Sequence, residues 1–282
     1  MTTANGLHPG DGALTPLQRC KANVVATLAV VAGPAKIRLH PMFAWSRTLA
    51  IKAAIYFAVF LVCMILIDAP LMRGLGHLPR WAVWFFGQIT DFGKSGWFLW
   101  PLGVIYLALA ALPAPLTRMS QAVLAAVQVR VGFLFLAIGI PSLFDTIIKR
   151  MIGRARPTVG GHLDPFLFKP FIWRAEFASL PSGHVTTAFA VMVAFGSLWP
   201  RWRTELLIYA GLIAISRMVV MAHFPSDVFA AALVGTFGAL LVRRYFALRR
   251  LGFSIGPDGA LHQYPGPSLK RIKAVARELL AP

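Results

Sequence analysis

Three short polar clusters interrupt an otherwise apolar chain, and each carries residues that could do chemistry. They read KRMIGRARP at 149–157, PSGH at 181–184 and SRMVVMAHFPSD at 216–227. Together they supply cations that bind phosphate oxygens, an imidazole that can attack phosphorus and a second imidazole that can transfer protons. The combination predicts phosphoryl chemistry at one shared site.

The cationic members of these clusters favour phosphate binding. Lys149 and Arg156 flank the first cluster, and Arg217 lies at the end of an apolar run in the third. A charge inside or near an apolar span is costly and is usually functional. Lys149, Arg156 and Arg217 together therefore predict a pocket that binds phosphate oxygens.

The second cluster predicts a helix start that binds an anion. Ser182 is a good N-cap residue, and Gly183 lets an anion approach the backbone N–H groups at the helix start. His184 follows at the mouth of the same helix. It can therefore serve as the general acid that protonates the leaving group.

The third cluster predicts a nucleophile with a supporting carboxylate. His223 and Asp227 are four residues apart, which is about one turn if the helix starts near Pro225. The carboxylate can accept a hydrogen bond from one ring nitrogen and fix the tautomer. The other ring nitrogen is then free to attack phosphorus.

Composition indicates that membrane helices position these clusters. The 282 residues are 57% hydrophobic and 13% charged, with a mean hydropathy of +0.68, which is typical of an integral membrane protein. We expect an all-α bundle of six transmembrane helices, with an interfacial helix at the aromatic stretch 81–86, between the first two spans. The six apolar runs are 49–67, 97–113, 131–148, 185–199, 206–222 and 228–242.

Alternation of the spans brings the three clusters to one membrane face. We expect a cytoplasmic or interfacial tail at 1–48, the six-span domain at 49–245 and a basic cytoplasmic tail at 246–282. The net charge of +18 then fits cations on inner loops better than nucleic-acid binding. Cytoplasmic loops carry an excess of Lys and Arg. The segment 149–182 departs from this pattern, because we expect it on the outer face and it is nevertheless basic. A bound anionic ligand would explain it.

The spacing of these residues resembles that of the type 2 phosphatidic acid phosphatase (PAP2) superfamily, the lipid phosphate phosphatases. Its pattern K-x6-RP, PSGH and SR-x5-H-x3-D is matched here at every specified position between 149 and 227, and the six-span layout extends the resemblance to 49–245. The resemblance implies a metal-independent double displacement without a cofactor. His223 would form a phosphohistidine supported by Asp227, and His184 would protonate the leaving group and later activate water. The phosphoryl oxygens would be held by Lys149, Arg156, Ser182, Gly183 and Arg217.

Several functions remain open at this point. The first is hydrolysis of a lipid phosphate or pyrophosphate at the extracytoplasmic face of the inner membrane. Candidate substrates are undecaprenyl pyrophosphate, phosphatidic acid, phosphatidylglycerol phosphate and lipid A phosphate. The alternatives are a lipid phosphotransferase on the same scaffold, a vanadium-dependent haloperoxidase, which the transmembrane character disfavours, and a binding or transport protein without turnover. The sequence indicates no oligomeric state.

Overall fold

The computed structural model describes residues 15–37, 47–112, 117–257 and 259–280. Residues 1–14 and 38–46 of the predicted N-terminal tail lie outside the described residues. The α-helices are α1 (Pro16–Ala32), α2 (Arg47–Val62), α3 (Asp68–Leu75), α4 (Arg80–Thr90), α5 (Gly96–Ala111), α6 (Arg118–Ile152), α7 (Gly183–Leu198), α8 (Arg203–Val219), α9 (Pro225–Leu248) and α10 (Leu269–Leu280). One π-helical turn, η1 (Cys63–Ile67), joins α2 to α3, and short 3₁₀ turns lie at Asp91–Gly93, Val159–Gly161, Ala175–Phe177 and Pro200–Trp202.

The predominantly helical, membrane-type architecture that the sequence predicts is confirmed. Among the described residues, four helical stretches are long and apolar enough to cross a membrane: Arg47–Leu75, Arg80–Ala111, Arg118–Ile152 and Pro225–Leu248. Two further apolar helices are shorter, Cys20–Ala32 and Gly183–Leu198. The aromatic stretch 81–86 is helical within α4 and continues through a 3₁₀ turn into α5. The six-span count stays a prediction.

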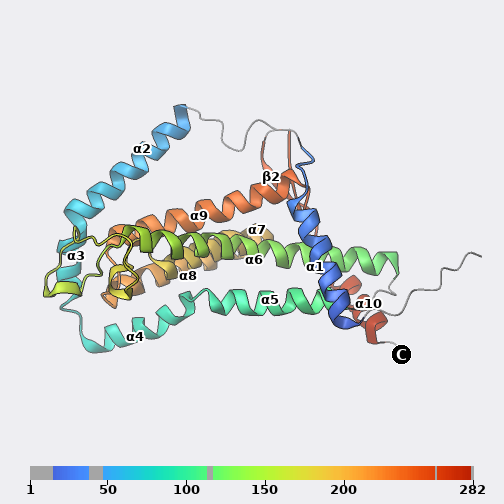
Figure 1. The fold of residues 1–282 in the computed structure, drawn as a ribbon, viewed down its shortest axis with the longest axis horizontal. Coiled ribbons are helices and arrows are strands. Elements are labelled where there is room, and N and C mark those ends of the chain that lie inside the picture. The colour runs from blue at the N-terminus through green and yellow to red at the C-terminus, as the bar shows by residue number, and fades with distance from the viewer. Residues whose placement is uncertain (1–14, 38–46, 113–116, 258, 281–282) are drawn as a thin grey trace, which may run out of the picture.

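Helices α5 to α9 lie side by side along the long axis of the molecule (Figure 1), and α7 packs against α6, α8 and α9. Close packing of α7 on α9 depends on Gly235, where an added Cβ would lie 2.3 Å from the carbonyl oxygen of Thr186. Small residues at helix crossings allow such an approach in membrane bundles. This contact fixes the start of α7 against the middle of α9.

The chain after α9 folds back onto the bundle. Strands β1 (Phe253–Ile255) and β2 (Leu261–Gln263) form an antiparallel hairpin in which Phe253 pairs with Gln263. Phe253 is buried and makes an edge contact with Phe133 of α6 at 4.7 Å between ring centroids. The sequence predicted a basic tail from residue 246 and not this hairpin, because two three-residue strands give almost no periodic signal.

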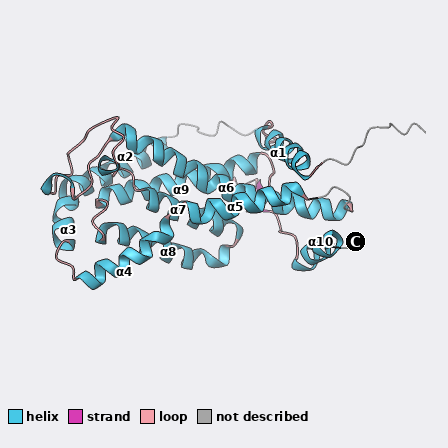
Figure 2. Ribbon diagram, turned by 60° about the horizontal axis from the view of Figure 1, so that its bottom comes forward, coloured by secondary structure: helices cyan, strands magenta, loops and turns pink. Residues whose placement is uncertain are grey.

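The two ends of the bundle differ in character. The end of α6 and the starts of α7 and α9 meet at one end, beside α3 and the segment 153–182, whereas α1, α10 and the hairpin lie at the other (Figures 1 and 2). Helix α2 leans away from the bundle in Figure 1, and none of its described residues is buried. The π turn then brings Asp68 to a fully buried position. The sequence marks Asp68 only as the charged end of the first apolar run.

Candidate active site

The three polar clusters meet at the end of the bundle that carries the segment 153–182. Helix α6 stops at Gly153, whose φ of 64° is the left-handed conformation of a helix C-cap, and its N–H donates to the carbonyl oxygen of Lys149. A Cβ at Gly153 would lie 1.8 Å from the carbonyl oxygen of Lys169. Glycine therefore allows both the turn and the close chain crossing that direct Arg154 and Arg156 away from the helix axis.

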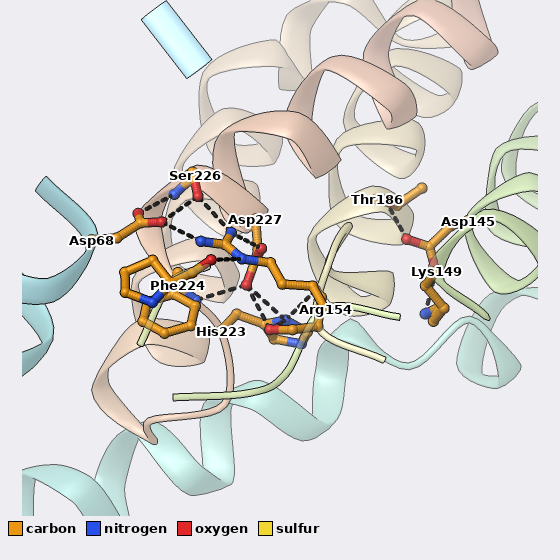
Figure 3. Close-up of polar contacts among 11 residues, drawn as sticks. Asp68, Asp145, Lys149, Arg154, Thr186, His223, Phe224, Ser226 and Asp227 are labelled. Carbon is orange, nitrogen blue, oxygen red and sulfur yellow. Dashed lines mark hydrogen bonds and ion pairs between the residues drawn. The ribbon is translucent and has the colours of Figure 1, made fainter. Parts of the chain in front are cut away.

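Lys149 lies beside the start of α7, paired with a carboxylate. Its ammonium forms an ion pair with Asp145, which also accepts a hydrogen bond from the Thr186 hydroxyl at 3.2 Å (Figure 3). A Cβ at Gly183 would lie 2.9 Å from the Lys149 nitrogen and 3.1 Å from an Asp145 oxygen. We predicted that Gly183 gives an anion access to the backbone. On the side where a Cβ would project, the space that glycine leaves is taken by this ion pair.

His184 lines a cavity of about 230 Å³ next to these residues. Lys149, Gly183 and Asp145 line the same cavity, together with the turn that joins α4 to α5. In that turn a Cβ at Gly93 would lie 3.0 Å from the Cβ of His184. The turn therefore packs directly on the first turn of α7 and limits where the His184 ring can lie.

Three polar atoms of the predicted phosphate-binding residues are buried without a hydrogen-bond partner among the described residues. They are the hydroxyl of Ser182 and the Nε atoms of Arg156 and Arg217. Ser182 occupies the N-cap position of α7, yet its side chain makes no capping hydrogen bond. Buried polar groups are nearly always paired in folded proteins. Unpaired donors from two arginines and a serine fit a site that binds an anion.

Arg217 is held from α4, an element that carries none of the three clusters. Its Nη1 donates to the hydroxyl of Thr90 at 2.7 Å, and both residues are almost completely buried. Thr90 was not among the predicted site residues. A lone threonine at the end of an aromatic helix gives no signal that would identify it.

His223 has one ring nitrogen engaged in a hydrogen bond with the main chain. Its Nδ1 lies 2.8 Å from the carbonyl oxygen of Ser179 and 3.9 Å from the nearest Asp227 oxygen. The carbonyl can only accept, so Nδ1 carries the proton and Nε2 is left unprotonated. The sequence predicted that Asp227 would make this hydrogen bond, but it lies beyond hydrogen-bond distance from the ring.

The pKa of His223 is lowered well below its usual value. Burial is the main cause, and the positive charges of Arg217 and Arg156 act in the same direction. The hydrogen bond with Ser179 opposes this shift without cancelling it. His223 is therefore a neutral imidazole at neutral pH, which is the form that can act as a nucleophile.

Asp227 is held by a buried network instead (Figure 3). One carboxylate oxygen accepts from the Ser179 hydroxyl at 2.6 Å and from the N–H of Phe224 at 2.9 Å. The other oxygen forms an ion pair with Arg154. Arg154 is 0% exposed and also pairs with Asp68 at 2.7 Å.

The burial of Arg154 was not expected from the sequence. Arg154 is one of six cations in the basic segment 149–182, and most arginines are exposed. The side chain is instead completely buried between two carboxylates. Ser179 was also missed. In the sequence, only its position two residues before the second cluster points to it.

All eight predicted site residues thus lie at one end of the bundle, on α6, α7, α8, α9 and their adjoining loops. Within the described ranges, no group of three or more His, Cys, Asp or Glu side chains is arranged to hold a metal ion. The geometry offers a neutral imidazole, a second histidine at a cavity and a cluster of cations with unpaired donors.

Comparison with known proteins agrees with this geometry. A family model of the PAP2 superfamily matches residues 130–251. The chain is 34% identical over 201 residues to a lipid A 1-phosphatase of Rhizobium johnstonii, covering 71% of this chain and 81% of the relative. It is 35% identical over 198 residues to a lipid A 1-phosphatase of Rhizobium etli, covering 70% and 84%.

Two solved structures are also similar. One is the crystal structure of Aquifex aeolicus LpxE, with 22% identity and a TM-score of 0.46, covering 64% of this chain and 96% of that one. The other is a transmembrane PAP2-type phosphatidylglycerolphosphate phosphatase from Bacillus subtilis, with 19% identity and a TM-score of 0.43, covering 80% and 95%. From the extent of the match to the curated relatives, the chain belongs to the PAP2 superfamily and is a phosphatase of that superfamily.

Proposed function

We propose that this protein removes the 1-phosphate of lipid A by hydrolysis, with His223 as the nucleophile. The observation that carries the proposal is the neutral, main-chain-bonded His223 beside buried donors of Ser182, Arg156 and Arg217 that lack partners in the described part of the chain. The choice of lipid is supported by the two lipid A 1-phosphatases, which match about 70% of this chain.

The first half-reaction transfers the phosphoryl group to the enzyme. The Nε2 lone pair of His223 attacks phosphorus, and the bond from phosphorus to the lipid oxygen breaks. His184 gives its proton to that oxygen as it leaves. Charge on the phosphoryl oxygens is stabilised by the donors of Arg156, Arg217 and Ser182, and such preorganised stabilisation is worth about 3–4 kcal/mol for one well-placed donor.

The second half-reaction releases inorganic phosphate. His184, now unprotonated, takes a proton from water as the water oxygen attacks phosphorus, and the bond to Nε2 breaks. His223 returns to its starting tautomer because the Ser179 carbonyl holds the Nδ1 proton throughout. Neither half-reaction involves a metal ion.

We further propose that six helices span the membrane and that the site faces the extracytoplasmic side. Support comes from α9, which starts at the site and ends near four arginines at the other end of the bundle, Arg243, Arg244, Arg249 and Arg250. Cytoplasmic loops carry an excess of such residues. In this orientation α4 lies at the outer interface, as its aromatic residues favour.

Phosphate release from a panel of lipids, with chelator present, tests the activity. The panel contains lipid A, phosphatidic acid, phosphatidylglycerol phosphate and undecaprenyl pyrophosphate. We expect release from lipid A, with mass spectrometry placing the loss at the 1-position. Release from another lipid alone would overturn the substrate, a metal requirement would overturn the mechanism, and transfer only to an added acceptor lipid would identify a phosphotransferase.

The variant His223→Ala tests the nucleophile. It should abolish phosphate release and leave no acid-labile phosphoenzyme after a quench with radiolabelled substrate. His262→Ala, on β2 at the other end of the bundle, is the matched control and should remain active. Substantial turnover by His223→Ala would exclude His223 as the nucleophile.

A further inference from the structure

A continuous chain of buried polar contacts leads from the first apolar stretch to the His223 ring. Asp68 accepts from Arg154, Arg154 donates to Asp227, and Asp227 accepts from the hydroxyl of Ser179 (Figure 3). The carbonyl of Ser179 then holds the Nδ1 proton of His223. The first two members belong to none of the three motif patterns.

We propose that Asp68 and Arg154 are positioning residues that fix the tautomer and direction of His223 by holding Asp227 and Ser179 in place. The proposal rests on the proposed role of His223 as the nucleophile. Neither residue touches the reacting atoms. They act through Asp227 and Ser179, whose positions determine the orientation of the His223 ring.

Arg154 holds Ser179 in two ways. The N–H of Ser179 donates to the Arg154 carbonyl oxygen at 3.1 Å, and the Ser179 hydroxyl is bonded to the carboxylate that the Arg154 guanidinium holds. Ser179, whose carbonyl selects the His223 tautomer, is thus held by Arg154 directly through its N–H and indirectly through Asp227. A shift of Arg154 would displace the carbonyl and rotate the ring.

The guanidinium is itself fixed on every side. Its Nε donates to the Pro165 carbonyl at 3.0 Å, Nη1 donates to the Ser226 hydroxyl at 2.7 Å and to Asp227, and Nη2 donates to Asp68. The ring of Phe224 lies 4.6 Å from its central carbon. The planar guanidinium of Arg154 can make all of these contacts in one orientation. A lysine ammonium lacks this directional geometry.

Stability alone is a poor reason for this cluster. Asp68, Arg154 and Asp227 are all completely buried, so two carboxylates and one guanidinium have lost their hydration. The desolvation of buried ion pairs often exceeds their attraction, and apolar residues of similar volume are frequently as stable. Because this cluster contacts Ser179, which binds the His223 ring, we infer that its role is to orient His223.

The backbone of the first apolar stretch is also adapted to this contact. The π turn η1 immediately precedes Asp68, and single π turns within helices occur frequently at functional sites. Asp68 then accepts from the N–H of Ser226 at 2.9 Å, in the first turn of α9, next to Asp227. One extra residue in a helix rotates the following side chains by about 100°, so the π turn sets the face on which Asp68 lies.

The variant Asp68→Asn tests the proposal with little change in shape. Asn has one acceptor oxygen where Asp68 uses both, one for the Ser226 N–H and the other for Arg154 and the Ser226 hydroxyl. Arg154 stays paired with Asp227, so no isolated charge is left. Because misplacement of a reacting group by about 1 Å costs on the order of 100-fold, we expect kcat to fall about 10- to 100-fold with KM nearly unchanged.

The readout that a merely structural role would not change is the tautomer of His223. In nitrogen NMR spectra of ¹⁵N-histidine-labelled protein, wild type should show His223 as a neutral ring with its proton on Nδ1, identified by comparison with His223→Gln. Asp68→Asn should show a mixture of tautomers. Arg174→Gln, at an exposed arginine on the same loop, is the matched control and should match wild type.

Each outcome decides the proposal. A wild-type tautomer in Asp68→Asn overturns it, whether or not activity falls. If Asp68→Asn does not fold, Ser226→Ala decides instead, because it removes the hydroxyl between Asp68 and Arg154 without changing the charge. If wild type releases phosphate from no lipid, the proposed function fails, and the tautomer comparison still tests the positioning role.

Discussion

The hydrogen bond from Arg217 to Thr90 gives a quantitative prediction. Thr90 is 7% exposed and Arg217 is 8% exposed, so water does not readily replace the 2.7 Å contact between them. Thr90→Val keeps the β-branched shape and removes the acceptor. A hydrogen bond to a charged group contributes about 1.5–3 kcal/mol. At about 1.4 kcal/mol for each factor of ten, complete loss in the transition state lowers kcat/KM about 10- to 150-fold.

The assay is phosphate release from the best lipid of the panel, measured for single and double variants. Arg217→Gln removes the cation itself and should cost about 100- to 1000-fold, as for one transition-state donor. The double variant should be no worse than Arg217→Gln, because Thr90 acts through that residue. Thr27→Val is the matched control, since the Thr27 hydroxyl donates to the Asn23 carbonyl oxygen of its own helix α1, at the other end of the bundle.

Two results would refute this reasoning. A fully active Thr90→Val would show that Arg217 does not depend on this acceptor. A double variant whose loss equals the product of the two single losses would show that Thr90 acts independently of Arg217. Thermal melting in detergent should show that all variants remain folded.

Three further predictions follow from the site. His184→Ala should reduce rates most for esters with poor leaving groups, and an equal loss across a series of aryl and alkyl phosphates would contradict its acid role. Because burial and the neighbouring arginines lower the pKa of His223, the nucleophile stays neutral as the pH falls through 6.5, and an acid limb of kcat/KM centred there would contradict this. Gly153→Ala should lower the free energy of unfolding by at least about 1–3 kcal/mol, because φ is 64°. Gly87→Ala, whose Cβ meets nothing within 4 Å, is the control in the same denaturation experiment.

The sequence predicts those parts of the site that depend on residue type and spacing. His184 and His223 were identified because each belongs to a polar cluster that interrupts the apolar sequence, and alternation of helices places both at one end. The helices themselves can be predicted from the apolar runs, because a helix in a membrane needs a long run of apolar residues and no specific pattern of partners. The resemblance to the PAP2 superfamily, which rests on this spacing, is confirmed by the comparisons.

The parts that could not be predicted are contacts between distant segments. Asp68 and Arg154 are 86 residues apart, and a charge at the end of an apolar run looks the same whether it faces water or a buried partner. Thr90 and Arg217 are 127 residues apart. The hydrogen bond from His223 to Ser179, in place of Asp227, depends on a loop conformation that has no periodic signal.

The unpaired donors of the site have a consequence for thermal stability. A buried polar group without a partner costs about 1–3 kcal/mol, and within the described residues Ser182, Arg156 and Arg217 each contain one such atom. Binding of inorganic phosphate or vanadate supplies acceptors for all three, so either anion should raise the melting temperature. Ser182→Ala should raise it without any anion while slowing turnover. The donors that bind the phosphoryl group therefore lower the stability of the fold, which is a trade-off between stability and activity.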